Sequence, residues 1–361
     1  MAKKKKKVIH IVESFGGGVF TFLSDLLNDL VDDYEVIVAY ALREQTPNNF
    51  KSYFNENIRF IEVKHLKRKI NLKDDFISMI EIRKIIKSEN PDIVHLHSSK
   101  AGILGRVGIH RKNIKMLYNP HGFSFLKMDD SKFKRLIYRM IEKCAAIINK
   151  KCIIVGCSKG EFLEAKKLNK KSIWINNGIN IYKLNNELKD LNQEKTNYHN
   201  FKICTVGRID FQKNPKDFND VAELFPQKQF TWIGEGNLKS ELTSSNIKVT
   251  GWLSRKKVLE NLCDNNIFIL TSLWEGLPIS LLEAMYMRKI CIVSNVIGNR
   301  DVIQHSKNGY IYNSIEELQD ILNNIDKDEN IYRVINNAYN DIITNYNMKS
   351  IIEEYKKVYE E

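Results

Sequence analysis

The chain has 361 residues, of which 43% are hydrophobic and 28% charged, and it carries a formal net charge of +12. These values are typical of a folded globular protein that is large enough for two domains. No apolar run reaches the roughly 18 residues that a membrane-spanning helix needs. The apolar stretch at residues 8–12 is also too short for a signal peptide, so neither class is expected.

The positive charge is concentrated in one half of the chain. Residues 1–185 contain 35 Lys and Arg against 19 Asp and Glu, whereas residues 186–361 contain 21 against 25. This asymmetry predicts that the first half faces an anionic partner, namely a membrane, a nucleic acid or a phosphate-bearing substrate. A general solubility feature is the alternative.

The first half of the chain alternates short β-branched segments with helical patterns. The predicted strands lie in "VIHIVE", "EVIVAYAL", "IRFIEV", "DIVHLH", "IKMLYN", "CIIVGCS" and "SIWIN". Strands that are apolar on both faces and alternate with helices indicate a parallel sheet covered by helices, the α/β class. Six cysteines, without a C-x-x-C pair, lie mostly within such apolar segments, and we expect reduced core thiols in a cytoplasmic protein.

The alternation pauses in the polar segment 185–200, which predicts a linker. It resumes with "FKICTVGRID", "QFTWIG", "IKVTG", "NIFILTS", "KICIVS" and "GYIY". The sequence therefore predicts two Rossmann-like domains, residues 1–184 and 201–345. A C-terminal helix within residues 346–361 is expected to pack back on the first domain.

Ligands of such folds bind beyond the carboxyl ends of the strands, so the loops there are the candidate sites. Gly16, Gly17 and Gly18 lie between the first strand and the first helix, where glycines allow backbone N–H groups to approach an anion. A tight turn without a ligand is the alternative. The loop is not G-x-G-x-x-G, and no acidic residue closes the second strand to hold a ribose, which weakens a dinucleotide reading.

Two cations follow a strand that is predicted to end at Val206. Arg208 and Lys213 stand in "VGRIDFQKNP", in the loop before a helix that begins near Pro215. A guanidinium and an ammonium group in this position are suited to clamp a diphosphate through charge-assisted hydrogen bonds. Ordinary surface cations are the alternative.

Two carboxylates stand eight residues apart in "WEGLPISLLEAM". Pro278 is predicted as the first residue of a helix, which places Glu275 in the loop before the helix and Glu283 inside it. Backbone N–H groups at the start of this helix suit an anion, and carboxylates accept hydrogen bonds from sugar hydroxyls. A salt bridge within an amphipathic helix is the alternative for Glu283. His121 follows a predicted strand beside Gly122, and a functional and a structural role are equally open.

These elements, in this order, resemble family 4 of the glycosyltransferases, the retaining sugar transferases of GT-B fold, over essentially the whole chain. The E-x7-E element is Glu275 to Glu283. The first glycine-rich loop, "PDIVHLHSSKAG", "PHG", "INNGI", "VGR…QKNP", "GEG" and "VTGW" fall where that family has counterparts. The GT-B fold implies two Rossmann-like domains whose parallel sheets face a central cleft. "SNVIGNRDVI" departs from the commoner Gly-Gly-x-x-Glu form, so the resemblance assigns no role to residues 298–301.

The resemblance implies a role for each matching residue. Arg208 and Lys213 would bind the donor diphosphate, Glu283 the nucleotide ribose and Glu275 the hydroxyls of the donor sugar. The other implied contacts are Gly276, Leu277 and Pro278 against sugar and phosphate, Gly17 and Gly18 over the diphosphate, His121 near the reacting carbon, and Trp252 and Leu253 near the base. The donor would be a nucleotide-sugar, with UDP-sugar favoured and GDP-sugar as the second choice. The family also implies retention of configuration.

No metal and no cofactor is expected, because fixed cations and helix N–H groups can stabilise the charge that develops on a leaving diphosphate. The D-x-D at Asp326 and Asp328 lies in a polar helix connection and is predicted to be solvated surface. His95 and His97 in "HLH" lack a matching Cys or acidic pair nearby, so they are predicted to be a strand end.

The segment 131–151 predicts a basic amphipathic helix. Its apolar residues at helical spacing are Phe133, Leu136, Ile137, Met140, Ile141 and Ala145, and its cations are Lys132, Lys134, Arg135, Arg139 and Lys143. Such a helix can lie on an anionic leaflet, where a lipid-linked saccharide acceptor of capsule, O-antigen or exopolysaccharide assembly would be reached. A helix whose apolar stripe belongs to the core is the alternative. The expected location is the cytoplasmic face of the cell membrane.

Other classes remain as alternatives. A nucleic-acid-binding protein would explain the basic half but not Glu275 and Glu283, and no nucleic-acid motif is present, so nucleic acid is not an expected partner. A Rossmann-type epimerase or dehydrogenase acting on a nucleotide-sugar is the nearer alternative. It predicts an acidic ribose clamp after the second strand, which this sequence lacks. A catalytically inactive relative is least favoured, because every proposed donor-binding position holds a competent residue.

Overall fold

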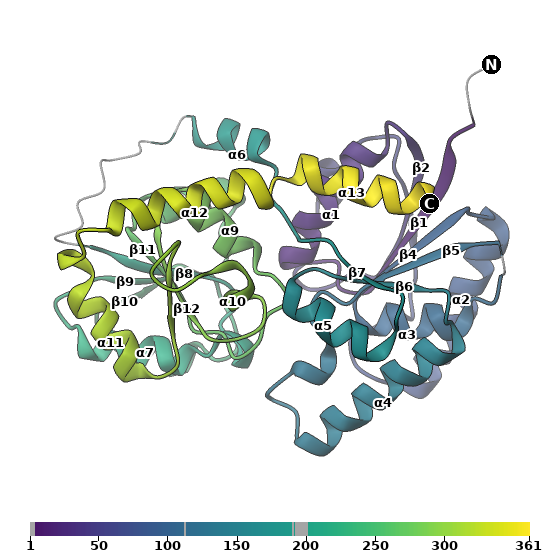
Figure 1. Ribbon diagram of the computed structural model, residues 1–361. Helices are drawn as coiled ribbons and strands as arrows, with labels where there is room; N and C mark the ends of the chain where they lie inside the picture. The colour runs from purple at the N-terminus through teal and green to yellow at the C-terminus, as the bar shows by residue number, and fades with distance from the viewer. Residues whose placement is uncertain (1–3, 112, 190, 192–200) are drawn as a thin grey trace. The chain divides into compact units, whose positions relative to one another are not determined.

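The computed structural model describes residues 4–111, 113–189, 191 and 201–361 (Figure 1). The chain divides into two compact units. Unit 1 comprises residues 1–126, 130–177 and 348–361, and unit 2 comprises residues 127–129 and 178–347. Each unit is built around a parallel sheet flanked by helices, and each is described separately.

Unit 1 contains a seven-stranded sheet in the order β3-β2-β1-β4-β5-β6-β7, with every neighbouring pair parallel. Its strands are β1 (Lys6–Val12), β2 (Tyr34–Tyr40), β3 (Arg59–Glu62), β4 (Ile93–His97), β5 (Lys115–Asn119), β6 (Ile153–Gly156) and β7 (Ser172–Trp174). Its helices are α1 (Gly17–Leu30), α2 (Leu72–Glu89), α3 (Ser99–Gly108), α4 (Lys132–Ile148), α5 (Lys159–Leu168) and α13 (Met348–Glu360).

Unit 2 contains a six-stranded sheet in the order β10-β9-β8-β11-β12-β13, again parallel. Its strands are β8 (Ile203–Val206), β9 (Phe230–Ile233), β10 (Ile247–Val249), β11 (Ile267–Leu270), β12 (Ile290–Ser294) and β13 (Tyr310–Tyr312). Its helices are α6 (Ile181–Leu188), α7 (Pro215–Leu224), α8 (Arg255–Cys263), α9 (Ile279–Tyr286), α10 (Asn299–Val302), α11 (Ile315–Asn324) and α12 (Ile331–Asn345). The predicted α/β class with two parallel sheets is confirmed.

The central strands of both sheets are buried on both faces, as their apolar runs require. In unit 1, one core cluster joins residues of β1, β2 and α1 to the apolar side chains of α13, and a second cluster fills the other side of the sheet. Figure 1 shows α13, in yellow, beside α1. In unit 2 a large cluster packs β8, β9, β11 and β12 against α7, α11 and α12. Burial of these apolar faces, worth about 25 cal/mol per Å², is the main stabilising term.

The predicted linker 185–200 is wrong at its start. Residues 185–188 belong to α6, whose Leu184 and Leu188 are buried and whose N-terminus is capped by the Asn180 side chain accepting from the N–H of Lys183. Two apolar residues at helical spacing suffice to anchor a helix this short, and this signal was missed. Residues 190 and 192–200 of the predicted linker lie outside the described residues.

None of the helices in the described part of the chain is long and apolar enough to cross a bilayer. Cys152, Cys157, Cys204 and Cys291 are buried free thiols, as predicted, while Cys144 is exposed.

Candidate functional site

The carboxyl ends of β8 and β11, neighbours in the sheet of unit 2, carry two of the predicted polar residues. Glu275 lies in the loop between β11 and α9 and is 7% exposed. Its carboxylate receives the Lys213 ammonium group at 2.6 Å and the Ser272 hydroxyl at 2.7 Å, and the Gln212 amide lies at 3.4 Å. The sequence predicted separate roles for Lys213 and Glu275, whereas the structure joins them in a partly buried ion pair.

The two predicted cations stand in different surroundings. The Arg208 guanidinium group lies 2.9 Å from the Asp210 carboxylate and is about one-third exposed. Asp210 also caps the short 3-10 turn that ends at Lys213, accepting from the Lys213 backbone N–H. Thr271, directly after β11, donates to the Lys213 carbonyl oxygen at 2.6 Å. The Lys213 backbone is therefore fixed from both strands, while Arg208 stays accessible.

The helix α9 begins at Ile279, with Pro278 as its N-cap, one residue later than predicted. Gly276, Leu277 and Pro278 are buried in the loop that leads into it. Glu283 lies inside the helix, is 5% exposed, and its Oε1 is 2.7 Å from the guanidinium group of Arg255. This ion-pair partner of Glu283 thus lies on α8 and not on α9, the helix that carries Glu283. Arg255 also contacts Glu187 of α6 at 3.2 Å, and sequence reasoning did not identify it.

The loop at residues 298–301, to which the resemblance assigned no role, requires a glycine at position 298. It has a φ of +86°, and a Cβ atom there would lie 2.5 Å from the Gly276 carbonyl oxygen and 2.9 Å from the Glu275 Cβ. Asp301 accepts from the Gly298 N–H at 3.1 Å. Only glycine combines this backbone conformation with this close approach. The loop therefore supports the position of Glu275.

Trp252 and Leu253 lie between β10 and the start of α8. Trp252 is 62% exposed and Leu253 is half-buried. The structure thus leaves an indole face open in unit 2, on the segment that leads into Arg255.

In unit 1, Gly17 and Gly18 form the exposed first turn of α1. Gly17 has a φ of +56°, and a Cβ atom added to it would meet nothing within 4 Å, so backbone conformation and not space favours glycine there. Gly16 precedes the helix, and among the described residues no side chain caps it. Backbone N–H groups at this helix start are available to an anion.

His121, two residues after β5, has a φ of +52°, an uncommon conformation for a residue with a side chain. Its Nε2 lies 3.0 Å from Nδ1 of His97, and Phe22 of α1 packs edge-on at 5.5 Å between ring centroids. Burial, followed by the neighbouring His95, lowers the pKa of His121 to about 3. The ring is therefore neutral at pH 7.

The acidic pair Asp326 and Asp328 and the histidines His95 and His97 were the two candidate metal sites predicted to bind no metal. Asp326 is exposed, as predicted, but Asp328 is half-buried and accepts a hydrogen bond from the Tyr310 hydroxyl at 2.5 Å, which gives it a structural role. His95 and His97 do lie at the end of a strand, β4. Sequence reasoning missed that His10 of the neighbouring strand β1 joins them, so that ring nitrogens of the three lie within 4.8 Å of one another.

Comparisons with known proteins agree with this architecture. The family model described as glycosyl transferases group 1 matches residues 186–341, and the model described as glycosyltransferase family 4 matches residues 16–149. The chain is 30% identical over 359 residues to the UDP-Gal:alpha-D-GlcNAc-diphosphoundecaprenol alpha-1,3-galactosyltransferase of Escherichia coli, covering 92% of this chain and 90% of the relative. It is 26% identical to the Escherichia coli O-antigen biosynthesis glycosyltransferase WbnH, covering 79% and 80%.

A solved structure supports the same conclusion for the fold. Anabaena HepE in complex with UDP and glucose superposes with a TM-score of 0.74 at 15% identity, covering 98% of each chain. The resemblance predicted from the strand-end loops is thereby confirmed at the level of the family. The chain belongs to family 4 of the glycosyltransferases, a family of retaining enzymes with the GT-B fold.

Proposed function

We propose that this glycosyltransferase moves a hexose from a UDP-sugar to a saccharide linked to a polyprenyl diphosphate, in the assembly of a bacterial surface polysaccharide. The Escherichia coli relative named above uses a UDP-galactose donor and an undecaprenol-linked acceptor, according to its name, and the HepE structure contains UDP. Both support UDP over GDP as the donor nucleotide. The alternative of an epimerase or dehydrogenase is set aside because the chain belongs to a transferase family.

The observation that carries this proposal is the Lys213–Glu275 pair beside the helix α9. An ammonium group has three N–H donors, so a contact with Glu275 leaves capacity for a phosphate oxygen of the donor. Glu275 in turn has lone pairs for a sugar hydroxyl. When the bond between sugar and diphosphate breaks, negative charge grows on the leaving phosphate, and Lys213 and Arg208 stabilise it.

Glu283 is the proposed ribose ligand. Its carboxylate is held by Arg255 from α8, and a carboxylate has about four lone-pair positions, so this ion pair is compatible with accepting a ribose hydroxyl. The guanidinium group fixes the carboxylate in one orientation, which lowers the entropy lost on binding. The exposed Trp252 ring, just before α8, is the proposed platform for the base.

Nucleotide binding is the first test. We expect UDP, in a panel with GDP, CDP, dTDP and NAD at millimolar concentration without added metal, to raise the melting temperature of the protein. At about 100 times the dissociation constant, a ligand adds about 2.7 kcal/mol to stability. The Arg208→Gln variant should lose much of this shift. Lys216→Met, which alters an exposed ion pair on α7, should keep it. A shift with NAD alone, or with none of the panel, would contradict a UDP-sugar transferase.

The acceptor side of the proposal rests on α4 of unit 1, which is oriented with its large apolar residues outward. Phe133 is 73% exposed, Leu136 53% and Met140 59%, whereas the buried residues of the helix are Glu142, Ala145 and Ala146. The alternative of an apolar stripe within the core is therefore wrong for these side chains. An apolar groove of about 350 Å³ continues this face, lined by Ile103 and Val107 of α3 and by residues of α4.

The five predicted cations lie on the same helix as this apolar face, and four of them have partners within unit 1. Arg135 donates to the Phe125 carbonyl oxygen, Arg139 pairs with Glu164 at 2.9 Å, and Lys143 donates to the Leu168 carbonyl oxygen. Lys134 pairs with Asp130 one turn earlier, and Lys132 is exposed at the helix start. Exposed apolar side chains on a helix that also carries cations are suited to an anionic bilayer, where the apolar groups enter the interface. We infer that α4 docks this enzyme on the membrane that carries its acceptor.

Vesicle flotation tests this docking. We expect the protein to float with anionic vesicles at low salt and to lose at least about tenfold in partitioning when Phe133 and Met140 are both replaced by serine, because each apolar side chain contributes up to about 1.5–3 kcal/mol when fully buried. The matched control is Leu72→Ser with Phe76→Ser, which removes two exposed apolar side chains from α2 of the same unit. Equal losses in both variants, or no flotation of the wild type, would argue against docking through α4.

A further inference from the structure

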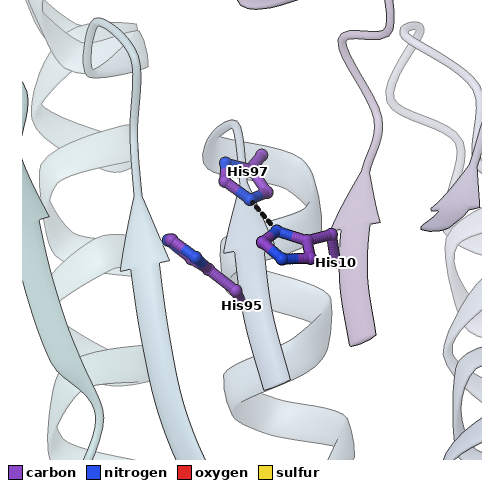
Figure 2. A group of neighbouring side chains, drawn as sticks. All are labelled: His10, His95 and His97. Atoms are coloured by element: carbon purple, nitrogen blue, oxygen red, sulfur yellow. Dashed lines mark hydrogen bonds between the residues drawn. The ribbon is translucent and has the colours of Figure 1, made fainter. Parts of the chain in front are cut away.

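Three histidines of unit 1 form a continuous hydrogen-bonded chain. Nδ1 of His10 lies 3.0 Å from Nε2 of His97, as Figure 2 shows, and Nδ1 of His97 lies 3.0 Å from Nε2 of His121. Both ring pairs have centroids 5.3 Å apart and nearly parallel planes, with interplanar angles of 16° and 17°. Parallel strands β1 and β4 bring the first two rings together, and the turn after β5 adds the third.

The three rings of this hydrogen-bonded chain, His10, His97 and His121, are neutral imidazoles at pH 7. Burial, followed by the neighbouring His95, lowers the pKa of His10 and of His97 well below 6.5, and it lowers that of His121 to about 3. A neutral imidazole has one N–H donor and one acceptor nitrogen. Two hydrogen bonds in series therefore have the same direction: either every ring carries its proton on Nε2, or every ring carries it on Nδ1.

The two ends of this chain are unsatisfied. Nε2 of His10 and Nδ1 of His121 are buried and have no hydrogen-bond partner among the described residues. One end must present an N–H group and the other a lone pair, and each unmet group costs about 1–3 kcal/mol. A ligand hydroxyl at His121 would satisfy its end of the chain.

A metal ion bound by His10, His95 and His97, whose ring nitrogens lie within 4.8 Å of one another, is a less favourable alternative. Nδ1 of His10 and Nε2 of His97 already share a hydrogen bond. Both nitrogens of His95 are engaged at 2.6 Å, one with the Tyr359 hydroxyl and one with the Asn119 side-chain oxygen. The described residues add no carboxylate to the three-histidine set, so a divalent charge would be buried without an anionic ligand.

We propose that His97 and His10 are positioning residues that hold His121 as its Nε2–H tautomer, so that the Nδ1 lone pair accepts a hydrogen bond from a hydroxyl of the bound sugar. The Nε2–H form is the intrinsically favoured tautomer of a neutral histidine, and the common direction of the chain makes this preference act on all three rings together. The proposal deepens the function proposed above and rests on it for the identity of the ligand. The positive φ of His121 and the edge contact with Phe22 hold the ring in place.

Two variants of His97 separate this role from mere packing. His97→Asn retains an amide oxygen near the position of Nδ1 that can accept from His121, whereas His97→Phe fills the space without any acceptor. Solid-state nitrogen-15 NMR of the histidine-labelled full chain reports the tautomer of His121, assigned by comparison with His121→Gln. We expect a single Nε2–H form in the wild type and in His97→Asn, and a mixture in His97→Phe.

Activity gives the second readout. In His97→Phe, kcat/KM for sugar transfer should fall by about 10–100-fold, as for loss of other groups that orient a site residue. Binding of UDP should be unchanged, because His121 is assigned to the sugar and not to the nucleotide. His97→Asn should restore most of the loss.

Several results would overturn the proposal. These are a wild-type His121 that carries its proton on Nδ1 or shows both tautomers, a His97→Phe variant with unchanged tautomer and rate, or one zinc ion bound per chain that His97→Phe abolishes. A wild type with a single Nε2–H form that transfers no sugar from any UDP-sugar would support the chain of tautomers and overturn the proposed function, so the two failures are distinguishable.

Discussion

Replacing Lys213 by methionine is expected to lower kcat for sugar transfer by about 10²–10³-fold, the loss seen when a fixed group that stabilises charge in the transition state is removed. Methionine keeps much of the volume of the side chain and removes the ammonium group that we propose binds the leaving diphosphate. It also leaves the Glu275 carboxylate, which is 7% exposed, without its cation. The measurement is steady-state kinetics with the UDP-sugar that stabilises the wild type most.

Loss of folding must be separated from loss of chemistry in this variant. The double variant Lys213→Met with Glu275→Gln removes both charges of the partly buried pair, so it should recover thermal stability but not turnover. Lys216→Met serves as the matched control, because Lys216 lies on α7 nearby and pairs with Asp220 on the surface. Turnover of Lys213→Met within twofold of the wild type, with the fold intact, would remove the diphosphate role.

Replacing Arg106 by methionine is expected to destabilise unit 1 by about 3–5 kcal/mol, the range for breaking a buried ion pair. Arg106 of α3 is fully buried, and its guanidinium group lies 2.5 Å from the Glu142 carboxylate of α4 and 4.3 Å from the centre of the Tyr118 ring. The substitution leaves Glu142, 1% exposed, with the Tyr118 hydroxyl at 2.8 Å but without its cation. Calorimetry should show a melting transition lower by about 6–20 °C.

The double variant Arg106→Met with Glu142→Leu tests whether the uncompensated charge is responsible. Replacing both members of a buried pair by apolar residues is often neutral, so most of the stability should return. The comparison pair is Lys257 and Glu260 on α8, where the same kind of substitution should change stability by less than about 1 kcal/mol. An Arg106→Met variant as stable as the wild type would show that water or a rearrangement compensates the charge of Glu142.

The fold and the positions of the strand-end loops could be predicted because they depend on local patterns. Strands that are apolar on both faces are visible in the sequence, and the carboxyl ends of neighbouring parallel strands lie at one edge of a sheet. This is why Lys213 and Glu275, 62 residues apart, are close together. The start of α9 was predicted to within one residue because proline marks the first turn of a helix.

The partners of these residues could not be predicted, because they depend on how helices pack. Arg255 gives no local signal that it contacts Glu283 of another helix. His10 meets His97 only through the register of β1 against β4. The orientation of α4 was also left open, since an apolar stripe at helical spacing suits a core and a membrane equally. The buried Glu142 decides it, and its burial depends on Arg106 of α3.

The helix α13 has a consequence for the order in which the protein folds during synthesis. Its apolar residues Met348, Ile351 and Ile352 belong to the same core cluster as β1 and α1. Its Tyr355 and Tyr359 hydroxyls hydrogen-bond Asn119 and His95 of the sheet. Unit 1 therefore lacks part of its core until the ribosome has translated all of unit 2. The first strands of unit 1 therefore lack their contacts with α13 for roughly 10–40 s of elongation at about 5–20 residues per second. We expect chaperones to bind these strands during that time.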